Sequence, residues 1–318
     1  MPLHVLHFRH QGRTQWGVVR SHLITPIPGE FATTAAFLRA CSLEALSALP
    51  APSLPEREVE VLSPITRNQQ FVCQGANYRQ HMIESGMDPD AKRYNMIFTK
   101  ASSCIVAADS PLVRPRGVRF LDYEIELGLV LKRDITSRQK ITDANLHEYI
   151  AGAVIVNDYS ARDIQIPQSQ FYKGKSFRTF GPVGPYLCLL ETADLARLGN
   201  LELTLTVNGA VRQQDSTANL VYGPAETLTE LSGIHDLHVG DLLSTGTPAG
   251  CALSIPSPAK QRLAALLREA TKWEMFMKVQ AGRAQYLKAG DLVESRIASP
   301  DGSIDLGVQH NRVIDEAA

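Results

Sequence analysis

Two glutamates stand inside an apolar segment that has the alternation of a β-strand. Residues 122–131 read DYEIELGLVL, and Glu124 and Glu126 are two positions apart within this run. Side chains in a strand point alternately to opposite faces, so these two carboxylates point the same way. Two carboxylates side by side on a half-buried surface repel each other unless a positive charge lies between them. A divalent cation is the simplest such charge, and the pattern therefore predicts a metal site on this strand.

A third acid, Asp158, follows the apolar run of residues 153–156, which is typical of a buried strand that ends where a functional loop begins. Hard cations such as Mg²⁺ bind to a few carboxylates together with waters and substrate oxygens, so Asp158 could complete the site. The alternative for the E-x-E pattern taken alone is the solvated face of an edge strand. The many polar side chains of residues 157–165 favour a functional site instead.

The chain resembles the fumarylacetoacetate hydrolase family from about Phe71 to its C-terminus, with one insertion. Six motifs occur in the order in which the family has them. They are NYRQH with Glu84 (77–84), DYEIEL (122–127), NDYSARDIQ (157–165), KGKSF (173–177), GTPAG (246–250) and GDLVE (290–294). Each motif is weak by itself, whereas six in order are specific.

This resemblance implies a mixed α/β, β-rich fold in which coiled mixed β-sheets surround a metal site. It implies Mg²⁺, or else Mn²⁺ or Ca²⁺, bound through Glu124, Glu126 and Asp158. Members of the family cleave C–C bonds in β-diketo acids, decarboxylate oxaloacetate, or isomerise and hydrate related compounds.

The resemblance also implies three catalytic side chains. His81 and Glu84 are three residues apart, so they lie on one face of a short helix, and they match a water-activating dyad on a mobile lid. Without the resemblance, such a pair is typical of a surface contact. Lys175, rather than Lys173, matches the cation that would stabilise an enolate.

Four further residues are candidates for contacts with the substrate or close to it: Tyr78, Arg162, Gln165 and Thr247. For Arg162, Gln165 and Thr247, ordinary turn and loop hydrogen bonding is an equally good explanation. The chain departs from the family pattern at Ala101, at Arg178 and in the continuation of the GTP loop. Arg178 could receive a second substrate carboxylate, or it could form a salt bridge with an outer acid.

The composition favours work on small molecules. The 32 basic and 33 acidic residues give a formal charge of −1, which attracts neither nucleic acid nor an anionic membrane. No stretch has the apolar length of a membrane span, and the N-terminus lacks a signal-peptide pattern, so we expect a cytoplasmic protein. We also expect a homodimer that acts on a small keto acid. The five cysteines are scattered without metal-ligand spacing and indicate core packing.

We expect two domains, a small N-terminal domain of residues 1–65 and a catalytic domain of residues 66–318. The prolines of residues 50–64 favour this boundary. His4, His7 and His10 alternate faces in a strand, which argues against a metal cluster there. In the catalytic domain, Asn208-Gly209 between two alternating runs predicts a hairpin.

A helical insertion is expected at about residues 255–286. Helical spacing predicts an amphipathic helix from Pro258 to Gly282 whose apolar face packs against protein. The members of that face are Leu263, Leu267, Trp273 and Phe276. A surface elaboration, a subunit contact and an active-site cover all remain open as its role.

The sequence therefore predicts a metal-dependent hydrolase that cleaves a C–C bond in a β-diketo acid of the acylpyruvate or fumarylpyruvate type. The alternatives are an oxaloacetate-type decarboxylase, an isomerase or hydratase of the same family, and a non-catalytic relative that binds a keto acid.

Overall fold

The computed structural model describes residues 2–256 and 267–317. Within these residues, the largest sheet is mixed and has thirteen strands. Its catalytic part runs in the order β15 (Leu187–Leu189), β12 (Ile150–Asn157), β11 (Ile125–Leu131), β18 (Leu242–Ser244), β6 (Phe71–Gly75) and β7 (Met96–Lys100). The central pair, β11 and β12, is antiparallel and buried on both faces. The sequence analysis expected β11 to be only half-buried, and this expectation is wrong because a second sheet covers its other face.

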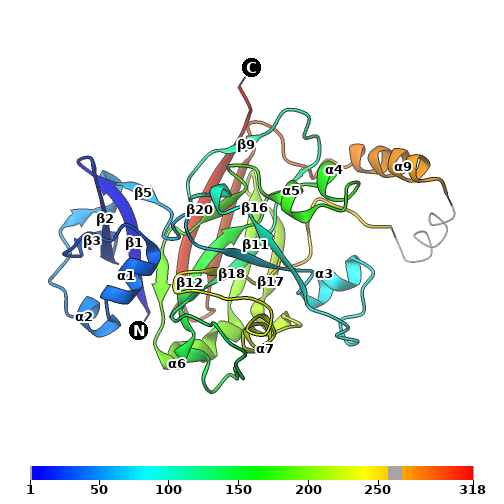
Figure 1. Ribbon diagram of the computed structural model, residues 1–318. Helices are drawn as coiled ribbons and strands as arrows, with labels where there is room; N and C mark the ends of the chain where they lie inside the picture. Colours follow the sequence, from blue (N-terminus) through cyan, green and yellow to red (C-terminus); the bar gives the residue numbers. More distant parts are fainter. Residues whose placement is uncertain (1, 257–266, 318) are drawn as a thin grey trace.

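The second sheet supplies that cover. Its strands are β17 (Ala210–Ser216), β16 (Glu202–Val207), β19 (Leu292–Ala298), β20 (Asp305–Asp315) and β9 (Leu112–Arg114), in that order. Leu127 and Leu129 of β11 share one core with Leu203 of β16 and Val293 of β19. Figure 1 shows these strands running beside each other through the centre of the molecule. The predicted β-rich α/β fold with mixed sheets is confirmed.

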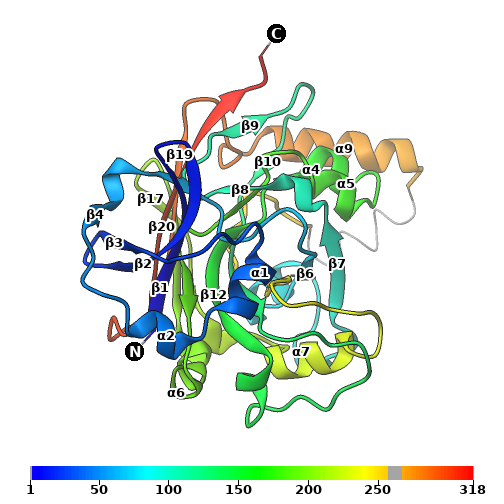
Figure 2. The ribbon, with the colours of Figure 1, turned by 60° about the vertical axis from the view of Figure 1, so that its left-hand side comes forward.

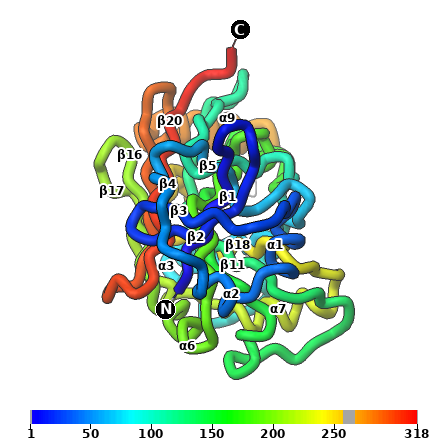
Figure 3. The backbone as a smooth tube through the Cα atoms, turned by 90° about the vertical axis from the view of Figure 1, so that its left-hand side faces the viewer, coloured from blue at the N-terminus to red at the C-terminus, as the bar shows by residue number. Residues whose placement is uncertain are grey.

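The N-terminal residues form a small lobe at one side of these sheets. It contains β1 (Leu3–His10), β2 (Arg13–Arg20), β3 (Leu23–Pro26), α1 (Thr34–Ala40), α2 (Leu43–Ser47), β4 (Leu54–Pro55) and β5 (Glu60–Leu62). β1 pairs with β15 of the catalytic part, so the large sheet continues across the predicted boundary at residue 65. Figure 3 shows the lobe in front of the catalytic strands.

The lobe has an aromatic core. The indole of Trp16 stacks between the His7 ring, 4.4 Å away, and the Phe37 ring, 4.5 Å away. The His7 Nδ1 atom is 2.7 Å from the carbonyl oxygen of Ser63. His7 is therefore part of the packing of the lobe, in agreement with the argument against a metal cluster.

The helices gather toward two ends of the molecule. Figure 2 shows α4 (Arg162–Gln165), α5 (Phe171–Lys175) and α9 (Glu269–Ala281) near one end, and α6 (Thr192–Leu195) and α7 (Pro224–Leu231) toward the other. Helix α3 (Arg79–Glu84) follows β6 and precedes β7. The remaining short strands are β8 (Ile105–Ala107), β10 (Leu121–Asp122), β13 (Ser160–Ala161) and β14 (Gly181–Val183).

Helix α9 lies within the predicted insertion. Residues 257–266, with the predicted helix start and Leu263, lie outside the described residues. Leu267 is 38% exposed, so the expectation that it is buried is wrong. Trp273 and Phe276 are half-buried and pack edge to face, with ring centroids 6.0 Å apart. The C-terminal end of the helix is held by Gln280, which donates to the Ser254 carbonyl at 2.8 Å.

The predicted hairpin is confirmed. Asn208 and Gly209 join β16 to β17 with φ angles of 53° and 78°. Both values lie in the left-handed region, as a two-residue type I′ turn requires. Elsewhere, the described cysteines are all free thiols, and no helix among the described residues is long and apolar enough to cross a bilayer.

Candidate active site

The three predicted carboxylates converge at one end of the β11–β12 pair. Ile125 lies opposite Asn157, and the Asp158 amide donates to the Glu124 carbonyl at 2.8 Å, so Glu124 and Asp158 continue the ladder just beyond the two strands. Glu126 is two positions further along β11, on the same side. Oxygen atoms of the three carboxylates lie within 4.8 Å of one another, and all three residues are buried. The same-face argument from the sequence therefore holds, although Glu124 precedes β11.

Buried cations surround two of these carboxylates. Lys175 donates to Glu124, to Asp158 Oδ2 at 2.6 Å and to the Ser160 hydroxyl at 2.9 Å. Lys100 donates to Asp158 Oδ1 at 2.5 Å and to the Phe180 carbonyl at 2.7 Å. These charge-assisted contacts fix both carboxylates in place.

A third cation, Arg162, links the acids to the neighbouring loop. Its guanidinium donates to Glu124 Oε1 at 2.5 Å and to Asp122 Oδ2 at 2.8 Å. Asp122 also accepts from the amides of Ala252, at 2.7 Å, and Leu253, at 2.9 Å. The segment that follows the GTP loop is thereby tied to the carboxylate cluster.

The electrostatic environments of Glu124 and Glu126 differ. Burial by itself would raise the pKa of Glu124, but Arg162 and Lys175 hold it well below its usual range. Glu126 forms no ion pair within the described part of the chain and accepts only from neutral donors, the Ser244 hydroxyl at 2.5 Å and the Gly246 amide at 3.0 Å. Burial, followed by repulsion from Asp158 and Glu124, raises the pKa of Glu126 to about 8.

This cluster fits a divalent cation. It offers three convergent carboxylate oxygens, which are the donors that Mg²⁺ and Mn²⁺ prefer. Four buried carboxylates, those of the three candidate ligands and Asp122, face the three cations Lys100, Lys175 and Arg162. With Glu126 ionised, as metal binding requires, one negative charge is left over among these groups, and a divalent cation would offset it.

The carboxylates form part of the wall of a cavity of about 210 Å³. Its polar side includes Gln74, His81, Arg162, Gln165, Lys175 and Thr247. The other side is apolar and is built from β7, from the segments around α4 and α5, from the loop after α3 and from the start of the insertion. The apolar wall consists of Met87, Met96, Phe98, Ile166, Phe171, Leu253 and Ile255.

The predicted dyad is only partly assembled in this structure. His81 lines the cavity, and its buried Nδ1 has no hydrogen-bond partner. Burial lowers the pKa of His81, so its ring is neutral near pH 7. Glu84 is exposed and accepts from Gln80 at 3.3 Å, and among the described residues no hydrogen bond joins it to His81.

The other predicted contact residues are buried. Gln165 accepts from Arg162 at 2.7 Å, and the Thr247 hydroxyl donates to the Ile125 carbonyl at 3.0 Å. Tyr78 is fully buried at the start of α3, and it is not among the described residues that line the cavity. Arg178 is exposed and also lies outside the cavity wall.

Two charged residues of the site were missed by the sequence analysis. Lys100 is fully buried and forms an ion pair with Asp158, but it was not among the predicted site residues. Asp122 is the first letter of the acidic motif, and it positions Arg162 and the loop at residues 252–253. Both residues stand in apolar runs of the sequence. A charged side chain in such a run needs a buried partner, so this pattern could have identified both residues as part of a buried charged cluster.

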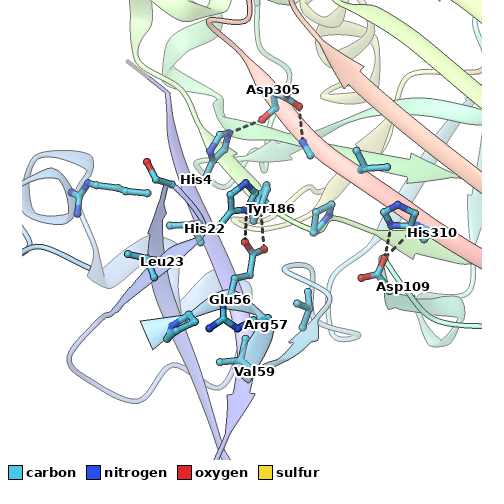
Figure 4. Close-up of a pocket in the computed structure, with 18 residues that line it drawn as sticks. His4, His22, Leu23, Glu56, Arg57, Val59, Asp109, Tyr186, Asp305 and His310 are labelled. Atoms are coloured by element: carbon cyan, nitrogen blue, oxygen red, sulfur yellow. Dashed lines mark hydrogen bonds and ion pairs between the residues drawn. The ribbon is translucent and has the colours of Figure 1, made fainter. Parts of the chain in front are cut away.

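A larger hollow of about 1120 Å³ lies between the N-terminal lobe and the catalytic sheets (Figure 4). Polar side chains that line this hollow form hydrogen bonds between the lobe and the catalytic part. The Tyr186 hydroxyl donates to Glu56 at 2.7 Å, and the His4 Nε2 atom is 2.6 Å from the Asp305 carbonyl oxygen. The smaller cavity, with its carboxylates and an unpaired imidazole, is therefore the candidate active site.

Comparison with known proteins shows the family of the chain. The family model for the fumarylacetoacetate hydrolase C-terminal domain matches residues 70–314. The mitochondrial oxaloacetate tautomerase FAHD2A of Bos taurus is 33% identical over 253 residues, which cover 79% of this chain and 70% of the relative.

Two solved structures are similar over nearly the whole chain. The fumarylacetoacetate hydrolase of Exiguobacterium antarcticum is 26% identical, with a TM-score of 0.74 over 99% of this chain and 100% of its own. A probable 2-hydroxyhepta-2,4-diene-1,7-dioate isomerase of Mycobacterium abscessus is 25% identical, with a TM-score of 0.73 over 100% of both chains. The matched motifs, the carboxylate cluster and these similarities together show that the chain belongs to the fumarylacetoacetate hydrolase family.

Proposed function

We propose that this protein catalyses the keto–enol tautomerisation of a 2-oxo acid, with a divalent cation, Mg²⁺ by preference, held by Glu124, Glu126 and Asp158. The observation that carries the proposal is the cavity in which three convergent carboxylates, the Lys175 ammonium and the His81 imidazole meet. A carbonyl compound exchanges its α-proton only when a base takes the proton and positive charge stabilises the enolate oxygen. The cavity provides both.

The roles of the side chains follow from their protonation states. His81 lines the cavity and is neutral, so its imidazole can take the proton from the carbon next to the 2-oxo group and return it to the oxygen. Asp158 and Glu124 outweigh the opposing effect of burial and raise the pKa of Lys175, so this residue stays cationic and can stabilise the developing enolate. A divalent cation bound to the carboxylates would supply further positive charge and would orient the substrate's carboxylate and 2-oxo oxygens.

Similarity supports this reaction class. FAHD2A is named an oxaloacetate tautomerase, and the structural neighbour from Mycobacterium abscessus is named a probable isomerase. Both names describe the interconversion of isomers of an acid, with no bond between carbon atoms broken.

Hydrogen exchange tests the proposal. The purified protein with Mg²⁺ should exchange the C3 protons of a 2-oxo acid for deuterium in D₂O, as followed by proton NMR. Chelator and Glu126→Gln should each suppress the exchange, because a carboxamide does not replace the charge of the ligand. Glu60→Gln, a change at an exposed acid of the N-terminal lobe, is the matched control. Exchange at the uncatalysed rate with every 2-oxo acid would contradict the proposal.

The predicted C–C hydrolysis of a β-diketo acid is the second candidate, because an unpaired imidazole in the cavity can also activate water. Hydrolysis would convert an acylpyruvate into pyruvate and a second carboxylic acid. Product analysis in H₂¹⁸O distinguishes the two: label in the released acid indicates hydrolysis, whereas proton exchange without cleavage indicates tautomerisation.

A further inference from the structure

Part of the cavity wall is apolar, with Met96, Phe98 and Phe171 among its residues. Phe98 and Phe171 contact each other with ring centroids 5.2 Å apart, and the Phe98 centroid is 5.3 Å from Lys175 Nζ. Met96 packs over Gly75 so closely that a Cβ on this glycine would be 2.6 Å from the methionine sulfur. This wall thus begins directly beside the cation that faces the reacting group.

None of the described residues of this wall offers a cation to a second carboxylate. Among the described lining residues, the positively charged ones are Arg162 and Lys175. Arg162 is bound to Asp122, Glu124 and Gln165. Arg178, the cation that the sequence offered for a second carboxylate, is exposed and outside the wall.

The charge of the buried cluster also favours a substrate with one carboxylate. When a divalent cation is bound and Glu126 is ionised, the four carboxylates, Lys100, Lys175, Arg162 and the cation together carry one positive charge. A substrate with one carboxylate makes the filled site neutral. A second carboxylate held against the apolar wall would leave a charge without a partner, which is costly where the charge is removed from water.

Gln74 also disfavours a second carboxylate on the substrate. It lines the cavity and is 1% exposed, and its Oε1 has no hydrogen-bond partner. Its amide nitrogen already donates to Asn95 and Thr227, each at 3.0 Å. The free oxygen can accept from a hydroxyl group but repels a carboxylate, which has no proton to donate.

We infer that the substrate is a monocarboxylic 2-oxo acid, or its enol, whose substituent beyond the reacting carbon is apolar and contacts Met96, Phe98 and Phe171. This inference rests on the proposed function and specifies its substrate class. Such a compound differs from oxaloacetate, which carries a second carboxylate.

Matched ligands test the inference. 2-Oxohexanoate and 2-oxohexanedioate have the same chain length and differ only in a terminal methyl or carboxylate group. We expect calorimetry with Mg²⁺ to show that the monocarboxylate binds at least tenfold more tightly. Along the series 2-oxobutanoate, 2-oxopentanoate and 2-oxohexanoate, affinity should rise roughly fourfold with each methylene that is buried.

Two variants locate the preference at the wall. Phe171→Ala should weaken the binding of 2-oxohexanoate about tenfold. The affinity for 2-oxobutanoate should stay near that of the wild-type protein. Tyr172→Ala is the control, because Tyr172 is the next residue of α5 but is exposed and does not line the cavity. Met87→Arg places a cation at the wall. It should therefore reduce the ratio by which 2-oxohexanoate binds more tightly than 2-oxohexanedioate.

The outcomes are distinct. Equal or tighter binding of the dicarboxylate by the wild-type protein would overturn the inference, as would a series in which chain length has no effect. If 2-oxohexanoate binds as expected but its C3 protons do not exchange, the proposed function fails while the monocarboxylate preference stands. Absence of binding by every 2-oxo acid would overturn both.

Discussion

Lys175 Nζ lies 2.6 Å from Asp158 Oδ2, so the cation assigned to the enolate also neutralises a predicted metal ligand. The same ammonium contacts Glu124. Two positive groups, Lys175 and a divalent cation, therefore compete for the oxygens of these carboxylates. A bound cation would weaken the hold on Lys175 and leave its ammonium available to the substrate.

Lys175→Met should consequently strengthen metal binding while it abolishes most turnover. A hydrogen bond to a charged group contributes about 1.5–3 kcal/mol, so Mg²⁺ affinity should rise by roughly tenfold or more. Loss of a group that stabilises an oxyanion should reduce kcat by about 10²–10³-fold. Calorimetry and the exchange assay measure the two effects, with Lys173→Met as the control, since Lys173 is exposed and donates to Gln168 at 2.7 Å. Weaker Mg²⁺ binding by Lys175→Met would contradict the competition.

The raised pKa of Glu126 predicts how stability depends on pH in the metal-free protein. Its pKa is about 8 in the folded state, against an ordinary value of 4.5. Between these values the folded state holds one proton more than the unfolded chain, so the free energy of unfolding should fall as pH rises, by up to about 1.4 kcal/mol per unit. Urea denaturation from pH 5 to 8 measures this slope. Glu126→Gln should remove this contribution, and Glu60→Gln should retain it.

The same proton opposes metal binding. Because Mg²⁺ needs the ionised carboxylate, its apparent affinity should rise by about tenfold per pH unit below pH 8 and level off above. Calorimetry in buffers of different ionisation enthalpy should detect release of a proton on binding. An affinity that is constant between pH 6 and 8 would show that Glu126 is already ionised.

His81→Ala should reduce the exchange rate by about 10²–10⁴-fold, the usual contribution of a positioned base, and leave Mg²⁺ affinity near wild type. Glu84 acts on His81 here through charge alone, and its carboxylate raises the pKa of the imidazole. Glu84→Gln should therefore shift the pH profile to lower pH and cost less than about tenfold. A loss as large as that of His81→Ala, without further loss in the double variant, would instead establish the dyad predicted from the sequence.

Asp122 should be important for stability. Asp122→Asn removes a charged partner from the buried Arg162 and weakens the anchor of residues 252 and 253. Breaking a buried ion pair typically costs about 3–5 kcal/mol, and urea denaturation should show a loss of that order. Asp109→Asn, at an exposed partner of His310, should change stability by less than about 0.5 kcal/mol. Equal losses in the two variants would contradict the anchoring role.

Local patterns in the sequence were sufficient to predict several elements. The hairpin at Asn208-Gly209 needs only two positive φ angles and two flanking strands, and both requirements are met by neighbouring residues. The alternation of Glu124 and Glu126 fixes their common side through the geometry of the chain itself. Asp158 was found because a long apolar run ends just before it. The assignment of Lys175 depended on the family resemblance, since no local pattern distinguishes it from Lys173.

Only the tertiary structure decided the rest, because the contacts concerned join residues far apart in the chain. Lys100 is 58 positions from the carboxylate it holds, and Asp122 is 130 positions from the Ala252 amide. The continuity of the N-terminal lobe with the catalytic sheet depends on the pairing of Leu3 with Leu189. The apolar wall is assembled from separate segments, each of which presents one or two ordinary apolar residues. The sequence by itself determined which groups could do chemistry, whereas packing decided which of them are paired, which are free, and what kind of substituent can lie beside them.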